Sequence, residues 1–418
     1  MKVTVLGSDK ALQKAASFAR FSRSLESFDT IWEKMNLEHQ ADELLDRVLA
    51  EYGDDSVQQL ASFHVVFEGI SIFAAKEIER SRTLSFIEKS SRYVEMKDTD
   101  FYRSIEEDQN IKLLFEFYRK AYRKSINEDL STNKASKAKA LDLARGLLPL
   151  GTLTTVGAHG SAQAFENLVF RLLAAPYIEL KQIGELLRVK LIDEAKPLFP
   201  NLTHEQRLAE YVANKAQWLN AFHYTTLEDD SDLSFFSNRG ISYLKIDHLP
   251  NSPKRENRRY KVGRELEFMT VDIGLETSYA TFRDLQRHRM GTIEWQQPNC
   301  NVWISDCEDN PSIDSIYEEA SNQYFASSYP KDIYSTPMCA STYWRWHLNF
   351  RELIFVMELR SQPQGHPAYR RLMGELKQAL EQRESYAYLL DTFLKHFDES
   401  ADSSREQSFQ NEEKKLHK

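Results

Sequence analysis

The amino-acid sequence predicts an α+β protein with two homologous halves, each made of helices packed on a small, mainly antiparallel sheet. Apolar residues recur at helical spacing through most of the chain, whereas alternating apolar runs are few and short. In addition, the pattern S-x8-R-x-R-x2-[ST] occurs twice, from Ser71 to Ser85 and from Ser278 to Thr292. A repeated pattern of this length indicates an internal duplication.

The expected elements follow from the spacing of apolar residues. The run Val3 to Leu6 predicts an N-terminal strand, and alternating runs at Phe63 to Phe67 and Phe268 to Asp272 predict a strand before each copy of the pattern. Within each copy we expect a serine-capped helix that ends in the two arginines. Apolar residues at helical spacing predict further helices over residues 41–52, 110–127, 134–148, 177–195, 203–222 and 367–397.

A second correspondence supports the duplication. Ser161 to Leu172 and Asn349 to Arg360 are both apolar-periodic helices, so the parts occur in the same order in both halves. An acidic stretch and a basic stretch lie between the halves. We therefore predict a first domain over residues 1–225, a second over 226–398, and a disordered polar tail over 399–418, which has too few apolar residues to order itself.

Composition excludes several classes of protein. With 54 Lys plus Arg against 63 Asp plus Glu, the net charge of −9 argues against a surface built for duplex nucleic acid, so any anion site must be local. The 3 cysteines have no metal-ligand spacing, and we expect free thiols and no metal site. The sequence shows neither a signal peptide nor a stretch of the roughly 20 apolar residues that span a membrane, and we expect a cytoplasmic protein without membrane contact.

The densest polar cluster is the segment Arg80 to Tyr93, which reads R-S-R-T-L-S-F-I-E-K-S-S-R-Y. Two arginines are followed by hydroxyl side chains, a glutamate and a further arginine. Hydroxyls, backbone N–H groups and a planar guanidinium can together hold the oxygens of a phosphate. A solvated basic turn with an incidental capping box explains the same residues, and composition alone leaves both interpretations open.

The spacing R-x-R-x2-S-x2-E-x-S-x-R-Y in this segment closely resembles the signature of the flavin-dependent thymidylate synthases, with Ser81 at the family's histidine and Ile87 at its asparagine. The resemblance continues into Ala144 to Leu150, which is similar to the family's A-R-x-x-L-P-L. In the second half, Arg287 to Arg289 restore the R-H-R triplet. Asn349 to Arg351, followed by Leu359-Arg360, are similar to the family's N-A-R helix that ends in L-R.

Each half lacks what the other half retains. After Thr292 the second half reads I-E-W-Q-Q-P-N, without the glutamate, serine and arginine of the phosphate loop, and in the first half the N-A-R triplet has become Ser161 to Gln163. Active sites of the family are assembled from several subunits of a symmetric tetramer. The resemblance therefore implies one composite site built from both halves, in a homodimer of tandem chains that forms a pseudo-tetramer.

The resemblance implies a role for each matching residue at the substrate. Ser90 and Arg92 match the ligands of the dUMP phosphate, with Arg145 assisting. Arg360 matches the arginine that faces the uracil ring, where a cation stabilises an anionic ring. Glu88 matches an orienting carboxylate, and we regard Arg360 and Glu88 as the catalytic candidates.

The resemblance also implies a cofactor, FAD. Arg287, His288 and Arg289 match the flavin-binding triplet, and Asn349 and Arg351 match further flavin contacts. Methylenetetrahydrofolate and NADPH are the implied co-substrates, because the flavin supplies the hydride and no cysteine nucleophile is required. We therefore expect conversion of dUMP, or a related pyrimidine nucleotide, to its methylated product. The departures from the motifs leave one alternative open: a non-catalytic nucleotide- or flavin-binding homologue with a regulatory or structural role.

Overall fold

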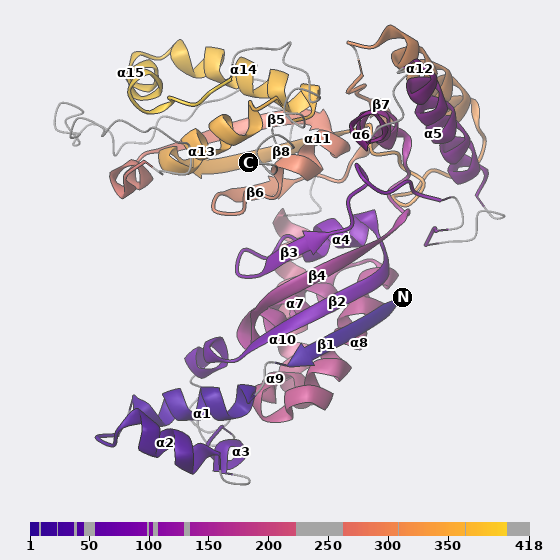
Figure 1. The fold of residues 1–418 in the computed structure, drawn as a ribbon. Coiled ribbons are helices and arrows are strands. Elements are labelled where there is room, and N and C mark those ends of the chain that lie inside the picture. Colours follow the sequence, from indigo (N-terminus) through magenta and orange to yellow (C-terminus); the bar gives the residue numbers. More distant parts are fainter. Residues whose placement is uncertain are drawn as a thin grey trace. The chain divides into compact units, whose positions relative to one another are not determined.

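A computed structural model describes residues 1–7, 10–22, 24–36, 40–45, 55–97, 100–102, 108–128, 134–222, 262–307, 309–363 and 365–398 (Figure 1). The chain forms two compact units. The first consists of residues 1–89, 100–102 and 151–225, and the second of residues 90–99, 103–150 and 226–418. The predicted domain boundary near residue 225 and the predicted polar tail lie outside the described residues, so the domain bounds stay a prediction.

The first unit is built on a four-stranded antiparallel sheet with the strand order β1-β2-β4-β3. Its strands are β1 (Lys2–Gly7), β2 (Ser62–Ser71), β3 (Ser85–Glu88) and β4 (Leu153–Ser161). Figure 1 shows α7, α8 and α10 behind this sheet. The helices of the unit are α1 (Ala11–Phe21), α2 (Phe28–Met35), α3 (Gln40–Leu45), η2 (Asp55–Leu60), α4 (Ile72–Ile78), α7 (Ala162–Ala174), α8 (Ile178–Ala195), η4 (Lys196–Leu198), α9 (Pro200–Thr203) and α10 (Glu205–Phe222).

The second unit contains a second antiparallel sheet, in which β8 pairs with β5, β6 and β7. Its strands are β5 (Thr270–Ser278), β6 (Thr292–Trp295), β7 (Asn299–Trp303) and β8 (Ala340–Asn349). Trp344 and Trp346 on β8 are fully buried and lie at the centre of its core. The helices of the unit are α5 (Gln109–Glu128), α6 (Lys134–Ala144), η3 (Arg145–Leu147), η7 (Arg264–Phe268), α11 (Tyr279–Leu285), α12 (Pro311–Ala326), α13 (Phe350–Arg360), α14 (Pro367–Glu381) and α15 (Glu384–Phe393).

The two sheets share one arrangement, in which β4 pairs with β2 and β3 and β8 pairs with β5 and β6. Ser85 pairs with His159, two residues before the cap of α7, and Thr292 pairs with His347, two residues before the cap of α13. The one irregularity between the two long strand pairs is a bulge in β2 at Gly69, whose φ of +65° suits glycine. This agreement supports the predicted duplication at the level of the backbone.

The predicted α+β class is confirmed, and so are the serine caps. The Ser71 side chain accepts a hydrogen bond from the backbone N–H of Ala74 at 2.9 Å, and Ser278 accepts one from that of Thr281 at 3.0 Å. Capping by serine satisfies an N–H group that has no partner within the helix. The N-terminal strand is also confirmed, and all three cysteines are free.

Three local predictions were wrong. The repeated helices end at Ile78 and Leu285, so their arginine pairs lie in the turns that follow. The predicted strand at Phe268 to Asp272 is out of phase, because the buried residues of β5 are Val271, Ile273 and Leu275, and a slip of one residue moves a strand's apolar set to the opposite face. The single helix expected over residues 367–397 is divided into α14 and α15.

A short antiparallel bridge joins Pro149 to Pro337 within the second unit. Leu150 N donates to Thr336 O at 2.8 Å, and Met338 N donates to Leu148 O at 2.9 Å. Pro149 and Pro337 stand at the same distance along the chain from the helix caps Ser161 and Asn349, so the bridge pairs equivalent positions of the repeat. A contact between equivalent positions is the signature of a local two-fold relation.

Candidate functional site

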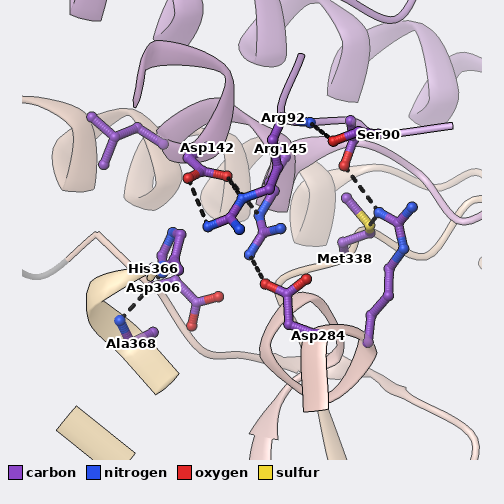
Figure 2. Close-up of polar contacts among 12 residues, drawn as sticks. Ser90, Arg92, Asp142, Arg145, Asp284, Asp306, Met338, His366 and Ala368 are labelled. Carbon is purple, nitrogen blue, oxygen red and sulfur yellow. Dashed lines mark hydrogen bonds and ion pairs between the residues drawn. The ribbon is translucent and has the colours of Figure 1, made fainter. Parts of the chain in front are cut away.

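Arg92 and Asp142 form a bidentate ion pair in the second unit (Figure 2). Arg92 Nε donates to Asp142 Oδ1 at 2.6 Å, and Nη2 donates to Oδ2 at 3.0 Å. Arg92 lies in the turn after β3, and Asp142 lies near the end of α6. Burial alone would lower the pKa of Arg92, but the charges of Asp142 and Asp284 raise it above its ordinary value. The guanidinium is therefore a fixed cation.

Arg145 is the second arginine of the site and is almost completely buried, with 2% of its surface exposed. Its Nη2 donates to Asp284 Oδ2 at 2.8 Å, and its Nε lies 3.8 Å from Asp142 Oδ1. Asp142 thus contacts both guanidinium groups, as Figure 2 shows. Two neighbouring cations in a protein interior are costly unless anions compensate them, and groups with perturbed pKa values cluster at functional sites.

Asp284 is held ionised by arginines from distant parts of the sequence. Burial would raise the pKa of Asp284, but Arg145, Arg92 and Arg360 hold it well below its usual range. Arg92 and Arg145 precede residue 225, whereas Asp284 and Arg360 follow it. The second unit therefore brings together candidate residues from both halves of the sequence.

Arg360 and His288 are joined by a hydrogen bond of 2.8 Å from Arg360 Nε to His288 Nε2. A guanidinium only donates, so Nε2 accepts and the ring proton is on Nδ1, which lies 3.7 Å from Glu352 Oε1. Burial lowers the pKa of His288, and the charge of Arg360 lowers it further. His288 is neutral at pH 7, and both of its nitrogens face protein groups.

The remaining cofactor candidates lie around β5, α11 and the start of α13. Arg287 is exposed and Arg289 is half-buried in the turn after α11. Arg351 Nη1 donates to Glu267 Oε1 at 2.7 Å, and its Nε donates to Val262 O at 3.0 Å. The Asn349 side chain caps α13 by accepting from Glu352 N at 2.9 Å.

This donor set fits the diphosphate of a flavin dinucleotide through its arginines. Arg351 and Arg360 lie at opposite ends of α13, about 14 Å apart along the axis at 1.5 Å per residue, so the candidate flavin contact and the candidate pyrimidine contact are well separated on this helix. Arg287, Arg289 and Arg351 supply guanidinium groups that suit phosphate oxygens. His288 and Asn349 are already engaged with Arg360 and with the end of α13.

Glu88 and Ser90 lie at the end of β3 and just beyond it. Glu88 belongs to the first unit, where its carboxylate is 2.9 Å from Lys76 Nζ and both side chains are fully buried. Lys76 also contacts Glu79. Ser90 Oγ accepts from the backbone N–H of Arg92 at 3.2 Å and so shapes the turn that carries this arginine.

Sequence reasoning missed several residues of the cluster. Asp142 precedes Arg145 by three positions, a helical spacing that offers a detectable signal. Asp284 lies within the repeated pattern, but nothing in the sequence around it predicts its ion pair with Arg145. His366 lies at the start of α14 and caps it: its Nδ1 accepts from Ala368 N at 3.2 Å, and burial, with the charge of Arg145, lowers its pKa to about 3.

Comparison with known sequences addresses the family. The sequence model of the family Thy1, described as thymidylate synthase complementing protein, matches residues 4–201. Residues 4–201 are thus similar in sequence to that family. This match confirms the predicted family. Among the residues that the structure describes, none of the helices has the length and apolar character needed to cross a membrane.

Sequences similar to this chain extend over most of its length. A UPF0159 protein of Chlamydia pneumoniae is 29% identical over 451 residues, which cover 85% of each chain. A UPF0159 protein of Chlamydia muridarum is 27% identical and covers 93% of this chain and 90% of its own. Among solved structures, thymidylate synthase X from Helicobacter pylori with FAD and dUMP has a TM-score of 0.35 and 20% identity, over 49% of this chain and 100% of that chain.

At equivalent positions of the two halves, the residues differ in pairs that contact each other. Gln59 Nε2 donates to Gln163 Oε1 at 2.9 Å in the first half, and the equivalent positions in the second half are Glu267 and Arg351, which form an ion pair of 2.7 Å. At the phosphate loop, the first half has the charged residue instead: Glu88 occupies the position at which the second half has Trp295. The charged members of each site are thus divided between the halves.

Proposed function

We propose that this protein methylates dUMP, or a related pyrimidine nucleotide, to the corresponding 5-methyl nucleotide at one composite site. FAD would be the cofactor, with methylenetetrahydrofolate as the methylene donor and NADPH as the reductant. The ion pair between Arg145 and Asp284 carries the proposal, because Arg92 from the first half and Arg360 from the second half both act on the same buried carboxylate.

Different residues of the chain would bind the two ends of the nucleotide, the phosphate and the pyrimidine ring. Ser90, Arg92 and Arg145 hold the phosphate, for which Asp142 keeps the guanidinium groups in place. Arg360 stabilises negative charge on the pyrimidine ring, and neutral His288 orients it by accepting from its Nε. Glu88, paired with Lys76, would be an orienting carboxylate.

The flavin would be held at the arginines of the second half. Arg287, Arg289 and Arg351 hold the diphosphate, with His288 and Asn349 beside them as the other proposed contacts. The bound flavin supplies the hydride that completes the methyl group. Since only one half retains each set of charged residues, the chain would carry one site type, in a cytoplasmic homodimer that mimics a tetramer of single units.

A non-catalytic nucleotide- or flavin-binding role is the second candidate. One observation favours it: Arg92 and Arg145 are each bonded to a carboxylate, so a phosphate must compete with Asp142 and Asp284 for them. Such internal neutralisation lowers the affinity that two free guanidinium groups would give.

Complementation tests the catalytic proposal. A strain that lacks its own thymidylate synthase should grow without thymidine when it expresses this chain, and the Arg360→Ala variant should not support growth. The purified protein should be yellow, and its flavin absorbance should fall when NADPH and dUMP are added. A yellow or nucleotide-binding protein that fails to complement would establish the second candidate instead, and a colourless protein without affinity for dUMP would reject both.

A further inference from the structure

Arg283 is a buried arginine that none of the proposed roles uses. It lies on α11 and is 3% exposed. Its Nη1 donates to Ser91 Oγ at 3.0 Å and lies 3.7 Å from Met338 Sδ. Ser91 is 2% exposed, so this hydrogen bond from a cation is shielded from water. Because Ser91 precedes residue 225, the bond links the two halves of the sequence at a second place, one residue away from Asp284.

The two copies of the repeat use this helix position for different contacts. The equivalent of Arg283 in the first half is Lys76, whose Nζ lies 2.9 Å from the carboxylate of Glu88 in the same half. The second half has Trp295 at the position of Glu88 and so offers no carboxylate there. The contact of Arg283 with Ser91 is therefore specific to the second copy, and it reaches the phosphate loop of the first.

Ser91 lies between the two loop residues that we assign to the phosphate, Ser90 and Arg92. The Ser90 hydroxyl accepts from Arg92 N at 3.2 Å, which shapes the turn locally but does not attach it to the rest of the protein. Two attachments do so. Arg92 is bonded to Asp142 on α6, and Ser91 is bonded to Arg283 on α11. The loop is thus fixed from the first half and from the second.

The residue after Arg283 contacts the other arginine of the proposed phosphate site. Asp284 Oδ2 accepts from Arg145 Nη2 at 2.8 Å. Neighbouring residues of one helix therefore hold Arg145 and the loop that carries Ser90. A ligand that needs donors from both must find them at a fixed separation, and the backbone of α11 supplies a rigid link between them.

We propose that Arg283 is a positioning residue that holds the loop of Ser90 and Arg92 against α11, so that the loop and Arg145 can bind one phosphate group together. The inference rests on the proposed function, because it takes from it the phosphate ligands. Arg283 itself contacts Ser91 rather than the nucleotide. The phosphate site of the first half would then depend on a residue of the second.

Binding of dUMP and of deoxyuridine, which lacks the phosphate, to the full-length protein with FAD tests the proposal by calorimetry. In Arg283→Met the affinity for dUMP should fall about 10- to 100-fold, the range for loss of a hydrogen bond to a charged group. The affinity for deoxyuridine should change less than twofold, because only the phosphate contacts are disturbed. Arg283→Lys keeps a charged donor and should retain part of the dUMP affinity.

A double-variant cycle identifies the contact itself. Ser91→Ala should also weaken dUMP binding, and the combination of Ser91→Ala with Arg283→Met should be no weaker than Arg283→Met alone, since both remove the same bond. The matched control is Ser125→Ala, a change at a buried serine of α5, which should leave both affinities unchanged.

Three results would overturn the inference: unchanged dUMP affinity in a folded Arg283→Met protein, an equal loss for dUMP and deoxyuridine, or additive effects in the cycle. If Arg283→Met does not fold, unchanged dUMP affinity in Ser91→Ala overturns it. Failure of the unmutated protein to bind dUMP would instead reject the proposed function, and this inference with it.

Discussion

Arg145 and Asp284 form a 2.8 Å ion pair although 139 residues separate them in the sequence, and both side chains are buried. Burial of a charge pair is costly unless each member is fully compensated. Asp284 receives compensation from three arginines, two of which precede residue 225. The pair therefore ties the first half of the sequence to the second through its charged residues.

Removal of one partner of this pair should be strongly destabilising. In Asp284→Asn the buried Arg145 loses its anion, and the free energy of unfolding should fall by about 3–5 kcal/mol. Urea unfolding measures this change. The double variant Asp284→Asn/Arg145→Met should recover much of the loss, because no uncompensated cation remains. The matched surface control is Asp193→Asn, because the Asp193 and Lys190 side chains are 60% and 50% exposed. This substitution should lower the free energy of unfolding by less than about 1 kcal/mol.

Acid should destabilise the protein through His366. Its pKa is about 3 in the folded state, below the usual 6.5, so the unfolded chain binds an extra proton between these values. Stability from this group is thus fully present above pH 6.5 and is lost as the pH falls toward 3, at up to about 1.4 kcal/mol per pH unit. His366→Asn keeps an acceptor at the start of α14. Its stability plotted against pH should lack this part of the slope, and an identical slope in both proteins would contradict the assignment.

Replacement of Arg360 by lysine should not preserve activity. Lysine lacks the Nε–H that His288 accepts and the planar group that stacks on Tyr369. We expect Arg360→Lys to lower kcat for dUMP methylation about 10²- to 10³-fold, the effect of losing one stabilising donor in an active site. Steady-state kinetics measure it, with Arg188→Lys on α8 as the control. Activity within tenfold of wild type in Arg360→Lys would argue against the proposed role.

Flavin stoichiometry offers a test that uses the repeat as its own control. Arg289 and Arg82 occupy equivalent positions, but only the first belongs to the proposed flavin site. The purified chain should bind one FAD, counted by absorbance against protein. Arg289→Ala should lose most of this flavin, whereas Arg82→Ala should retain it. Retention in the first variant and loss in the second would move the cofactor to the other half.

The sequence predicted features that depend on local pattern, and it failed where distant contacts decide. The α+β class, the serine caps and the gapless alignment of the repeat were all predictable, because each depends on residues close together in the chain. The phase of β5 was misjudged because Thr270 and Asp272 alternate on the outer face while the buried set is Val271, Ile273 and Leu275. The contact of the Tyr369 ring with Arg360 had no signal in the sequence, since it depends on tertiary packing.

The candidate site was predictable in its residue types but not in its internal charge balance. The motifs pointed to Arg92, Arg145 and Arg360, whereas their carboxylate partners were not foreseen. Asp142 belongs to the same helical segment as Arg145, yet its contact with Arg92 spans 50 positions. Such pairings depend on tertiary structure, which short motifs do not encode.

The bridge between Pro149 and Pro337 should be insensitive to dilution of the protein. In two separate subunits, this contact would form by collision and would weaken on dilution. Here both segments belong to one polypeptide, so the connecting chain supplies a high effective concentration that does not change with the amount of protein. This part of the fold should persist at nanomolar concentrations at which an equivalent pair of free subunits would separate.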